Sequence, residues 1–198
     1  MSLELMLSRL DVLKNAAVEN RAVNLHLGCG PQILPGFVNI DKYHEHEHVV
    51  KMDLSKLAFA DSSVQMIYSS HALEHLPFRR AKLALHEWAR VLRPNGELYL
   101  AIPDLESTMA FMLDPDVAYS AKWNWYIYTM FGYQVDPSKY ANNQALDLPD
   151  DEGQFHKCGF TEQTITQFLG EAGLRVTECF KYDGYGTLSL FVTASKRG

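Results

Sequence analysis

A glycine pair follows the first short apolar run of the chain. Gly28 and Gly30 flank Cys29 directly after the run Val23 to Leu27. Glycine adopts positive φ without strain and lets the backbone approach a ligand closely, so such a turn is suited to holding part of a small molecule. The further glycine of the dinucleotide-binding fingerprint is missing, so an ordinary strand-to-loop connection also explains the turn.

Two carboxylates follow later apolar runs. Asp41 closes the run 37–41, and a carboxylate at the end of such a strand accepts hydrogen bonds from the ribose hydroxyls of an adenosine. Asp53 and Leu54 follow the run 49–52. There the acid would receive the exocyclic amine of an adenine, and the backbone amide would donate to a ring nitrogen. A helix N-cap is the competing interpretation of Asp53.

His71, Glu74 and His75 fit the pattern H-x-x-E-H, which is a zinc-protease signature. On a helix, His71 and His75 would share a face and bind one metal ion. A protease would need this motif within a substantial helix, and Pro77 truncates any such helix. We therefore favour the simpler interpretation, in which these residues open the segment after a fourth strand.

A second group of histidines alternates with acids. His44, His46 and His48 are separated by Glu45 and Glu47, and in an extended segment the three imidazoles would project to one side and could capture a metal. A solvated loop is the more common outcome for such a run. We assign no metal ligand from the sequence.

Hydrophobic periodicity predicts the elements that position these residues. Apolar-rich runs predict strands at 23–27, 37–41, 49–52, 64–69 and 97–102. Amphipathic spacing predicts helices at 3–17, 79–92 and 162–172, and the segments 174–182 and 187–195 predict a terminal hairpin. For the last helix, Thr161 is the expected N-cap and Gly173 the expected stop.

Strands that alternate with helices predict an α/β fold with a doubly wound, mostly parallel seven-stranded sheet. The last strand is expected to be antiparallel because it closes a hairpin. In such sheets, ligands bind outside the carboxyl ends of the strands. Gly28, Asp41, Asp53, Ser70 and Asp104 all follow predicted strands, so the sequence predicts one site at this edge.

Composition limits the classes of function. The chain has 198 residues, 47% hydrophobic and 21% charged, with a formal net charge of −6, which predicts one globular domain and makes a large nucleic-acid surface unlikely. The three cysteines form no C-x-x-C pair, and no apolar run is long enough to span a membrane. With no secretory signal visible, we expect a cytoplasmic protein.

Residues 105–154 form a long segment with no dominant helical period. Such a segment is typical of an insertion within a single domain, here the domain 1–198. Its aromatic residues include Trp123, Trp125, Tyr126, Tyr128, Phe131, Tyr133 and Tyr140. Two interpretations stand side by side: an aromatic substrate lid, or a satellite core of locally packed rings.

Several motifs in order resemble a known family. They are Leu25 to Pro31, Asn39-Ile40-Asp41, Met52-Asp53-Leu54, Tyr68 to Leu76 and Arg90 to Leu98. Together they resemble class I S-adenosylmethionine-dependent methyltransferases, in particular a small bacterial subgroup of predicted methyltransferases with Leu-Pro-Gly before the second strand. The resemblance implies a Rossmann-like methyltransferase fold and S-adenosylmethionine as cofactor. The residues it implies as cofactor contacts are Gly28, Cys29, Gly30, Asp41, Asp53, Leu54, Ser70 and His71.

Two positions depart from the family pattern. The family usually carries an acid two residues before the first glycine, where this chain has His26. Only residues 31–36 separate the glycine turn from Phe37, where the family usually has a full helix. The shorter connection shortens the wall that normally covers the cofactor.

The resemblance implies methyl transfer by in-line displacement onto an unidentified acceptor, for which a small molecule or a saccharide is expected. A base is needed only for a hydroxyl or a protonated amine, and His71, Asp104 and His156 are the candidates. A structural cap is an equally simple role for His156. The alternatives are a non-catalytic cofactor-binding or regulatory module and, with less support, a nicotinamide-dependent oxidoreductase.

Overall fold

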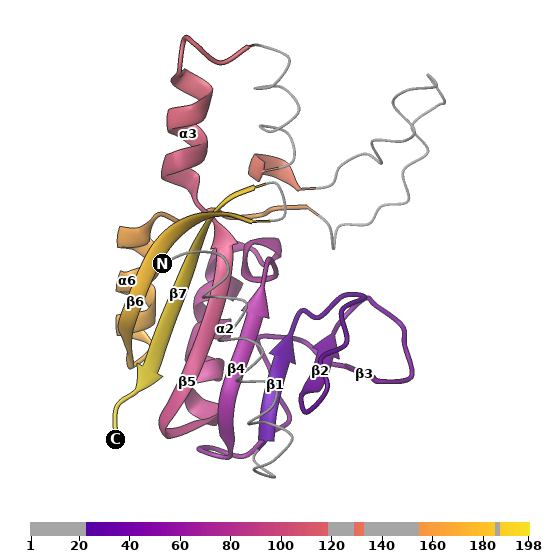
Figure 1. Ribbon diagram of the computed structural model, residues 1–198. Helices are drawn as coiled ribbons and strands as arrows, with labels where there is room; N and C mark the ends of the chain where they lie inside the picture. Colours follow the sequence, from indigo (N-terminus) through magenta and orange to yellow (C-terminus); the bar gives the residue numbers. More distant parts are fainter. Residues whose placement is uncertain (1–22, 119–128, 133–154, 185–186) are drawn as a thin grey trace.

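The computed structural model describes residues 23–118, 129–132, 155–184 and 187–198 (Figure 1). The helix predicted over residues 3–17 lies outside these ranges, as do most of the aromatic residues of the 105–154 segment. In the described part of the chain, no helix is both long and apolar enough to cross a membrane.

Seven strands form one sheet in the order β3-β2-β1-β4-β5-β7-β6. β1 pairs in parallel with β2 and β4, and β4 pairs in parallel with β5. β7 runs antiparallel between β5 and β6, which confirms the expected mostly parallel α/β sheet. The bounds are β1 (Val23–Leu27), β2 (Val38–Asp41), β3 (Val49–Lys51), β4 (Val64–Ser70), β5 (Leu92–Pro103), β6 (Leu174–Gly184) and β7 (Thr187–Lys196).

Two helices cover one face of the sheet, behind the strands in Figure 1: α2 (Phe78–Val91) and α6 (Glu162–Glu171). The buried residues of α2 recur at helical spacing, and they are Ala81, Ala84, Leu85, Trp88, Ala89 and Val91. The helix ends just before Arg93-Pro94-Asn95-Gly96, as predicted, but these residues belong to β5, which begins at Leu92 and not at residue 97. Asn95 takes a φ of 61° in this first, irregular part of the strand. The amphipathic pattern therefore predicted both the helix and the face that it buries.

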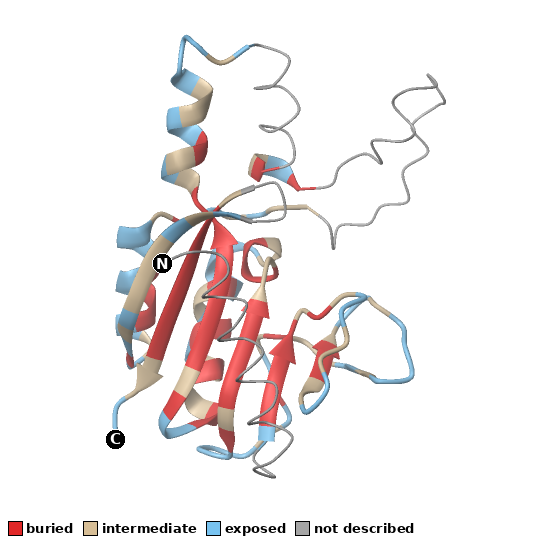
Figure 2. Cartoon of the chain, in the orientation of Figure 1, coloured by how far each residue is buried: buried red, intermediate tan, exposed pale blue. Residues whose placement is uncertain are grey.

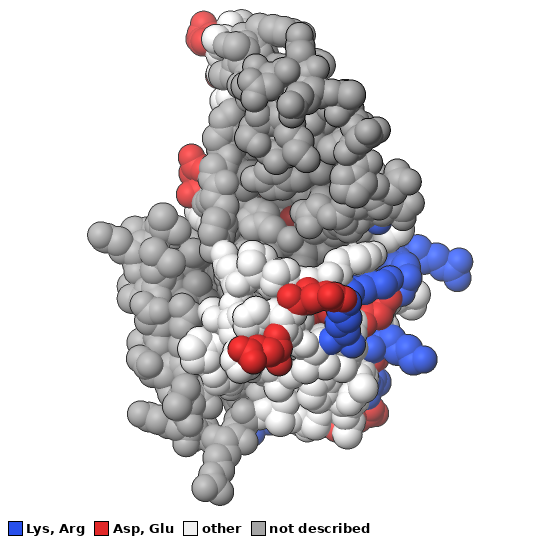
Figure 3. Space-filling model, turned by 90° about the vertical axis from the view of Figure 1, so that its right-hand side faces the viewer, with Lys and Arg blue, Asp and Glu red and all other residues white. Residues whose placement is uncertain are grey.

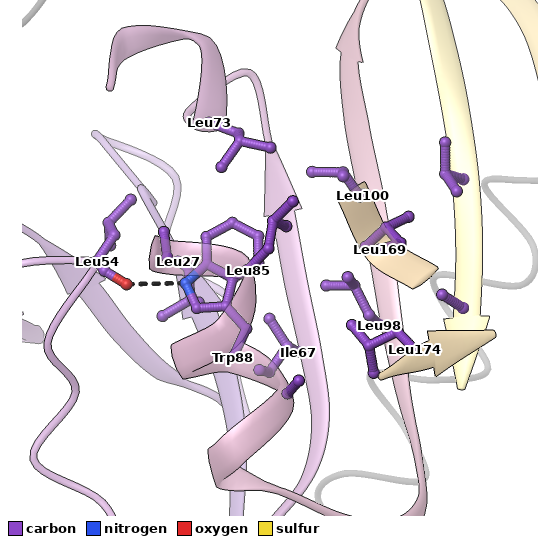
Figure 4. Packing of buried hydrophobic residues seen from close by; sticks show 14 of the residues in the cluster. Leu27, Leu54, Ile67, Leu73, Leu85, Trp88, Leu98, Leu100, Leu169 and Leu174 are labelled. Carbon is purple, nitrogen blue, oxygen red and sulfur yellow. Dashed lines mark hydrogen bonds between the residues drawn. The ribbon is translucent and has the colours of Figure 1, made fainter. Parts of the chain in front are cut away.

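Trp88 is the largest side chain that is fully enclosed in the core. Its indole Nε1–H donates to the carbonyl oxygen of Leu54 at 2.8 Å, as Figure 4 shows. This bond ties α2 to the turn after β3 while the ring packs among apolar side chains such as Leu27 and Leu85. The main core thus continues from the sheet to the turn after β3. Figure 2 shows that most residues of the central strands are buried.

The opposite face of the sheet holds a second apolar cluster of Met66, Tyr68, Tyr99, Ala101 and Phe191. Side chains alternate along a strand, so Ile67 points into the main core while its neighbours in β4 point into this cluster. The central strands are therefore lined by apolar residues on both faces, as expected for parallel strands inside an α/β sheet.

α6 begins and ends at the residues that the sequence predicted. The hydroxyl of Thr161 accepts from the backbone N–H of Thr164, and the hydroxyl of Thr164 accepts from the N–H of Thr161, which closes a capping box. Gly173 takes a φ of 87° just after the helix, the left-handed conformation that glycine adopts without strain.

The segment after β5 corrects one expectation. Residues 105–154 carry no dominant helical period, yet α3 (Leu105–Leu113) forms at the start of this segment, beyond the carboxyl end of the sheet (Figure 1). The apolar residues of this helix are not gathered on one face. Met109 and Leu113 are exposed, while the polar Thr108 is buried. The helix therefore lacks an amphipathic stripe, which is the signal that periodicity depends on.

Candidate active site

The two glycines of the first turn differ in what surrounds them. Both adopt positive φ, 68° at Gly28 and 49° at Gly30. A Cβ on Gly28 would come within 2.2 Å of the Ala72 Cβ, whereas a Cβ on Gly30 would meet no atom within 4 Å. Gly28 thus permits close packing against the segment after β4, and Gly30 borders open space.

Asp41 organises the loops at the end of β2. One carboxylate oxygen, Oδ2, accepts from the Gly30 N–H at 2.9 Å. The other, Oδ1, accepts from the backbone N–H groups of Tyr43 at 2.8 Å and His44 at 2.9 Å. Each oxygen has two lone pairs, so one lone pair on Oδ2 is left for a ligand hydroxyl next to the open space at Gly30.

Asn39 holds the short connection between the glycine turn and β2. Its side chain accepts from the Leu34 N–H at 2.9 Å and donates to the Leu34 and Phe37 carbonyls. His26, which is 2% exposed, donates from Nδ1 to the Asn39 Oδ1 at 3.0 Å. His26, which stands where the family has an acid, is therefore buried and supports the shortened loop through its hydrogen bond to Asn39. No local sequence pattern indicates this role of Asn39.

Asp53 lies in a network of donors after β3. It accepts from the Ser55 hydroxyl at 2.7 Å and the Ser55 N–H at 3.0 Å, and it pairs with Arg80 at 2.7 Å and Lys42 at 3.5 Å. Partial burial acts to raise its pKa, but these hydrogen bonds and charges outweigh burial and lower the pKa to about 2. The side chain caps a turn rather than a helix, and Leu54 beside it is buried.

Mixed charge surrounds this edge of the molecule. On the face seen in Figure 3, acidic and basic side chains lie next to one another. Ion pairs of the molecule include Lys51–Glu45 and Arg80–Asp53.

Ser70 and His71 come at the end of β4. Among the described residues, the Ser70 hydroxyl has no hydrogen-bond partner, and the side chain is partly exposed. His71 adopts a φ of 50°, which is strained for a residue with a side chain, and its N–H donates to the Ala101 carbonyl. Its Nδ1 lies 3.3 Å from the Glu74 Oε1, and its Nε2 lies 3.5 Å from the Ser189 hydroxyl.

Asp104 is fully enclosed and serves as the N-cap of α3. Its carboxylate accepts from the Glu106 N–H at 3.2 Å and from the Ser107 hydroxyl. The Lys181 ammonium lies 3.2 Å from Oδ2. The structure therefore gives this side chain a capping role, and a catalytic role for Asp104 remains a prediction.

Buried thiols are poor nucleophiles in this chain. Burial, together with the Asp41 charge, raises the pKa of Cys29 to about 11. Burial and the Glu74 charge raise the pKa of Cys158 to about 12. Cys29 thus acts as a small residue in the glycine turn, since only the thiolate attacks readily.

A pocket of about 240 Å³ lies beyond the end of β5. Half of its lining residues come from the 105–154 segment, and they are Leu105, Thr108, Thr129, Met130 and Phe131. The remainder are Pro103, His156, Lys157, Cys158 and Gly159. The pocket therefore lies between α3, residues 129–132 and the segment that leads to α6.

His156 lines this pocket and is 10% exposed. Its Nδ1–H donates to the Thr129 carbonyl at 2.9 Å, and its Nε2 lies 3.9 Å from the Glu74 Oε1. Burial lowers the pKa of His156 below its ordinary value, although the Glu74 charge opposes this shift. The sequence predicted a role for His156 but not its proximity to Glu74, from which it is separated by 82 residues in the chain.

The histidine motifs are arranged differently from either metal hypothesis of the sequence. His71 precedes a short 3₁₀ turn, η1 (Leu73–His75), so H-x-x-E-H does not lie on the helix that a zinc protease needs. His44 and His46 stack with ring centroids 6.4 Å apart in an exposed loop. In the described ranges, the ligand atoms that lie within 4.8 Å of one another belong instead to Glu74, His75 and His156.

Comparison with known proteins supports a methyltransferase fold around this site. Residues 25–100 match the methyltransferase domain family. No curated protein matches the chain. A SAM-dependent methyltransferase from Methanosarcina mazei has a TM-score of 0.60 at 15% identity, over 88% of this chain and 92% of its own.

Two further solved structures share the fold. The 1,6-didemethyltoxoflavin-N1-methyltransferase of Burkholderia thailandensis, solved with 1,6-didemethyltoxoflavin and S-adenosylhomocysteine, has a TM-score of 0.57 at 14% identity, over 93% of this chain and 77% of its own. The magnesium protoporphyrin IX methyltransferase of Synechocystis, solved with S-adenosylhomocysteine, has a TM-score of 0.56 at 12% identity, over 96% and 82%. Residues 25–100 thus match the methyltransferase domain family, and the chain as a whole has the fold of class I, S-adenosylmethionine-dependent methyltransferases.

Proposed function

We propose that the chain transfers the methyl group of S-adenosylmethionine to a small-molecule acceptor, such as a saccharide or another metabolite. The cofactor would lie across the ends of β1, β2 and β4. The acceptor would bind in the pocket at the end of β5, which is the neighbouring strand. The observation that carries this proposal is the open space beside Gly30, next to the ordered Asp41 carboxylate.

The residues at this edge fit the cofactor chemically. The space that a side chain at Gly30 would fill is open to a ligand, and Asp41 keeps an acceptor position for a ribose hydroxyl. Gly28, Cys29 and Leu54 would form the floor, while Asp53 would approach the adenine. Ser70 and His71 would border the methionine end from β4.

When bound, S-adenosylmethionine supplies an electrophilic methyl group on a sulfonium sulfur. The chain's residues must then align the acceptor with this group and exclude water. A pocket of about 240 Å³ is small beside typical ligand sites, so it suits a small acceptor or one group of a larger one. α3 and residues 129–132 form one side of it, which supports the proposal that the 105–154 segment acts as a substrate lid.

The base candidates differ in their surroundings. The Asp104 carboxylate caps α3 and forms an ion pair with Lys181. His156 lines the pocket, and its Nδ1–H is held by the Thr129 carbonyl. His71 lies at the end of β4, next to the proposed cofactor site, with Nδ1 close to the Glu74 carboxylate. We therefore place His71 first among the three for an acceptor that must lose a proton.

Two neighbours of the same fold carry names that refer to small molecules, namely 1,6-didemethyltoxoflavin and magnesium protoporphyrin IX. Their low identity extends only the fold to this chain, so they support the class of acceptor by analogy. The saccharide alternative rests on the resemblance to the small bacterial subgroup.

A paired titration tests the proposal. Calorimetry with S-adenosylhomocysteine and, separately, with NAD is expected to show binding of the first and none of the second. A preference for NAD would indicate an oxidoreductase. Binding of neither ligand would favour a non-catalytic module and would contradict the proposed function.

A further inference from the structure

A buried carboxylate with no hydrogen bond of good geometry lies among three histidines next to the proposed site. Glu74 is 1% exposed, and in the described part of the chain neither of its carboxylate oxygens has a hydrogen bond of acceptable geometry. Buried polar groups in proteins are nearly always satisfied, and a buried carboxylate in particular needs a donor or a cation. The His71 Nδ1 lies 3.3 Å from Oε1, and a cation would stabilise the buried Glu74 carboxylate more fully than this imidazole does.

The imidazoles of His75 and His156 lie beside this carboxylate, and each can offer its Nε2 as a ligand atom. His75 donates from Nδ1 to the Phe155 carbonyl at 3.2 Å, and His156 donates from Nδ1 to the Thr129 carbonyl at 2.9 Å. A backbone carbonyl only accepts, so the proton of each neutral ring is on Nδ1 and the lone pair is on Nε2. Metal-binding histidines are typically oriented in this way, by a backbone carbonyl on the second ring nitrogen.

We propose that Glu74, His75 and His156 form a binding site for a divalent transition-metal ion of the zinc class. Two imidazole nitrogens and one carboxylate oxygen are ligands that zinc takes in proteins. Their ligand atoms lie within 4.8 Å of one another, and ligands of a tetrahedral zinc ion lie about 3.4 Å apart. The side chains therefore need to approach one another by at most about 1.4 Å.

The backbone already holds the three ligands together. The N–H of Lys157 donates to the Glu74 carbonyl at 2.8 Å, and the N–H of Cys158 donates to the same oxygen at 3.3 Å. The rings of His75 and His156 meet edge to face with centroids 4.8 Å apart. His71 stands behind the carboxylate, with Nδ1 at 3.3 Å from Oε1, where it would orient a ligand rather than be one.

This site would join η1 to the segment before α6 and lie at the wall of the pocket that His156 lines. Three protein ligands leave a fourth position on a tetrahedral ion, as in zinc sites that bind water or substrate. His156 would then be a ligand and not a base, which leaves His71 as the base candidate. The proposal does not depend on methyl transfer.

The test uses the full chain, stripped of metal with a chelator and without cofactor. Titration with Zn²⁺ by calorimetry is expected to show one ion per chain, and Co²⁺ is expected to give the intense visible bands of a tetrahedral site. Glu74→Gln and His156→Gln should each weaken Zn²⁺ binding by at least about a hundredfold, and His71→Ala by about tenfold to a hundredfold. His86→Gln, on the exposed side of α2, should bind as the unmodified chain does.

The exposed histidines of the 44–48 loop need their own control. A variant with His44, His46 and His48 all changed to Ala should retain the single Zn²⁺ ion. Loss of uptake in this variant, uptake that survives Glu74→Gln, or no uptake by the unmodified chain would each overturn the proposal. Since the Co²⁺ spectrum is recorded on the unmodified chain, a variant that fails to fold does not decide the result.

Discussion

At the residue scale, two glycines two positions apart have different functions. Gly28 adopts positive φ where a side chain would collide with Ala72, so its main role is packing. Gly30 adopts positive φ beside open space, so it leaves room for a ligand. The sequence predicted that both glycines matter, but their different surroundings depend on where the segment after β4 lies.

Gly30→Ala separates ligand binding from backbone strain when it is compared with Gly173→Ala. Both glycines adopt positive φ with no atom within 4 Å of the added Cβ, so each change should cost about 1–2 kcal/mol of unfolding free energy. Only Gly30→Ala should also weaken S-adenosylhomocysteine binding, because only Gly30 borders the proposed site. Equal loss of binding in both variants would refute this role of Gly30.

Gly28→Ala should be the most damaging of these glycine changes. It adds a contact of 2.2 Å with the Ala72 Cβ to the same strain, and overpacking costs about 1–3 kcal/mol more. Urea unfolding measures the difference, and a Gly28→Ala variant as stable as Gly30→Ala would contradict the packing role.

Asp53 should make stability depend on pH. Its folded-state pKa of about 2 is below the ordinary value of 3.8, so it stabilises the fold fully above pH 3.8, and this contribution is lost as the pH falls through about 2. Because the side chain is partly exposed, we expect about 1–2 kcal/mol. The gap in unfolding free energy between the unmodified chain and Asp53→Asn should therefore narrow between pH 5 and pH 2, and a constant gap would argue against the prediction.

At the element scale, prediction from sequence succeeded where the signal is local. β1 has the predicted bounds, and α2 and α6 lie within about one residue of theirs. Thr161 and Gly173 cap α6 as expected, because capping depends on residues close in the chain. α3 was not predicted, because its apolar residues are distributed around the helix and form no stripe. Its N-cap, Asp104, was considered only as a candidate base.

Thr161→Ala should destabilise the fold by about 1 kcal/mol, because it removes one half of the capping box of α6. Gln163→Ala is the matched control, since Gln163 is exposed within the same helix and alanine favours helix. Thermal unfolding compares the two. A Thr161→Ala melting temperature equal to that of the control would mean that the box adds nothing to stability.

At the scale of the whole molecule, the fold brings together residues that no local pattern connects. Alternation of strands and helices predicted the sheet, and the sheet in turn predicted that Gly28, Asp41 and Ser70 share one edge. The contacts of His26 with Asn39 and of Glu74 with His156 were not predicted. Such pairs depend on strand register and on the path of the segment before α6, neither of which local periodicity encodes.

The core that supports this edge should respond to a single deletion. Leu100 in β5 is fully buried, whereas Leu83 on α2 is 54% exposed. Leu100→Ala is expected to cost about 2–5 kcal/mol of unfolding free energy, and Leu83→Ala less than about 0.5 kcal/mol. Denaturant titration checks both values, and similar costs for the two leucines would contradict the burial described for the sheet.

The measurement that tests the central claim most directly is calorimetric titration of S-adenosylhomocysteine into the unmodified chain, Asp41→Ala and Asp61→Ala. Asp61 is an exposed acid that pairs with Arg90, away from the carboxyl edge of the sheet. We expect the unmodified chain and Asp61→Ala to bind alike, and Asp41→Ala, if folded by circular dichroism, to bind at least about tenfold more weakly, or about 1.4 kcal/mol. Binding that is unchanged in Asp41→Ala, or absent from the unmodified chain, would contradict the cofactor site described here.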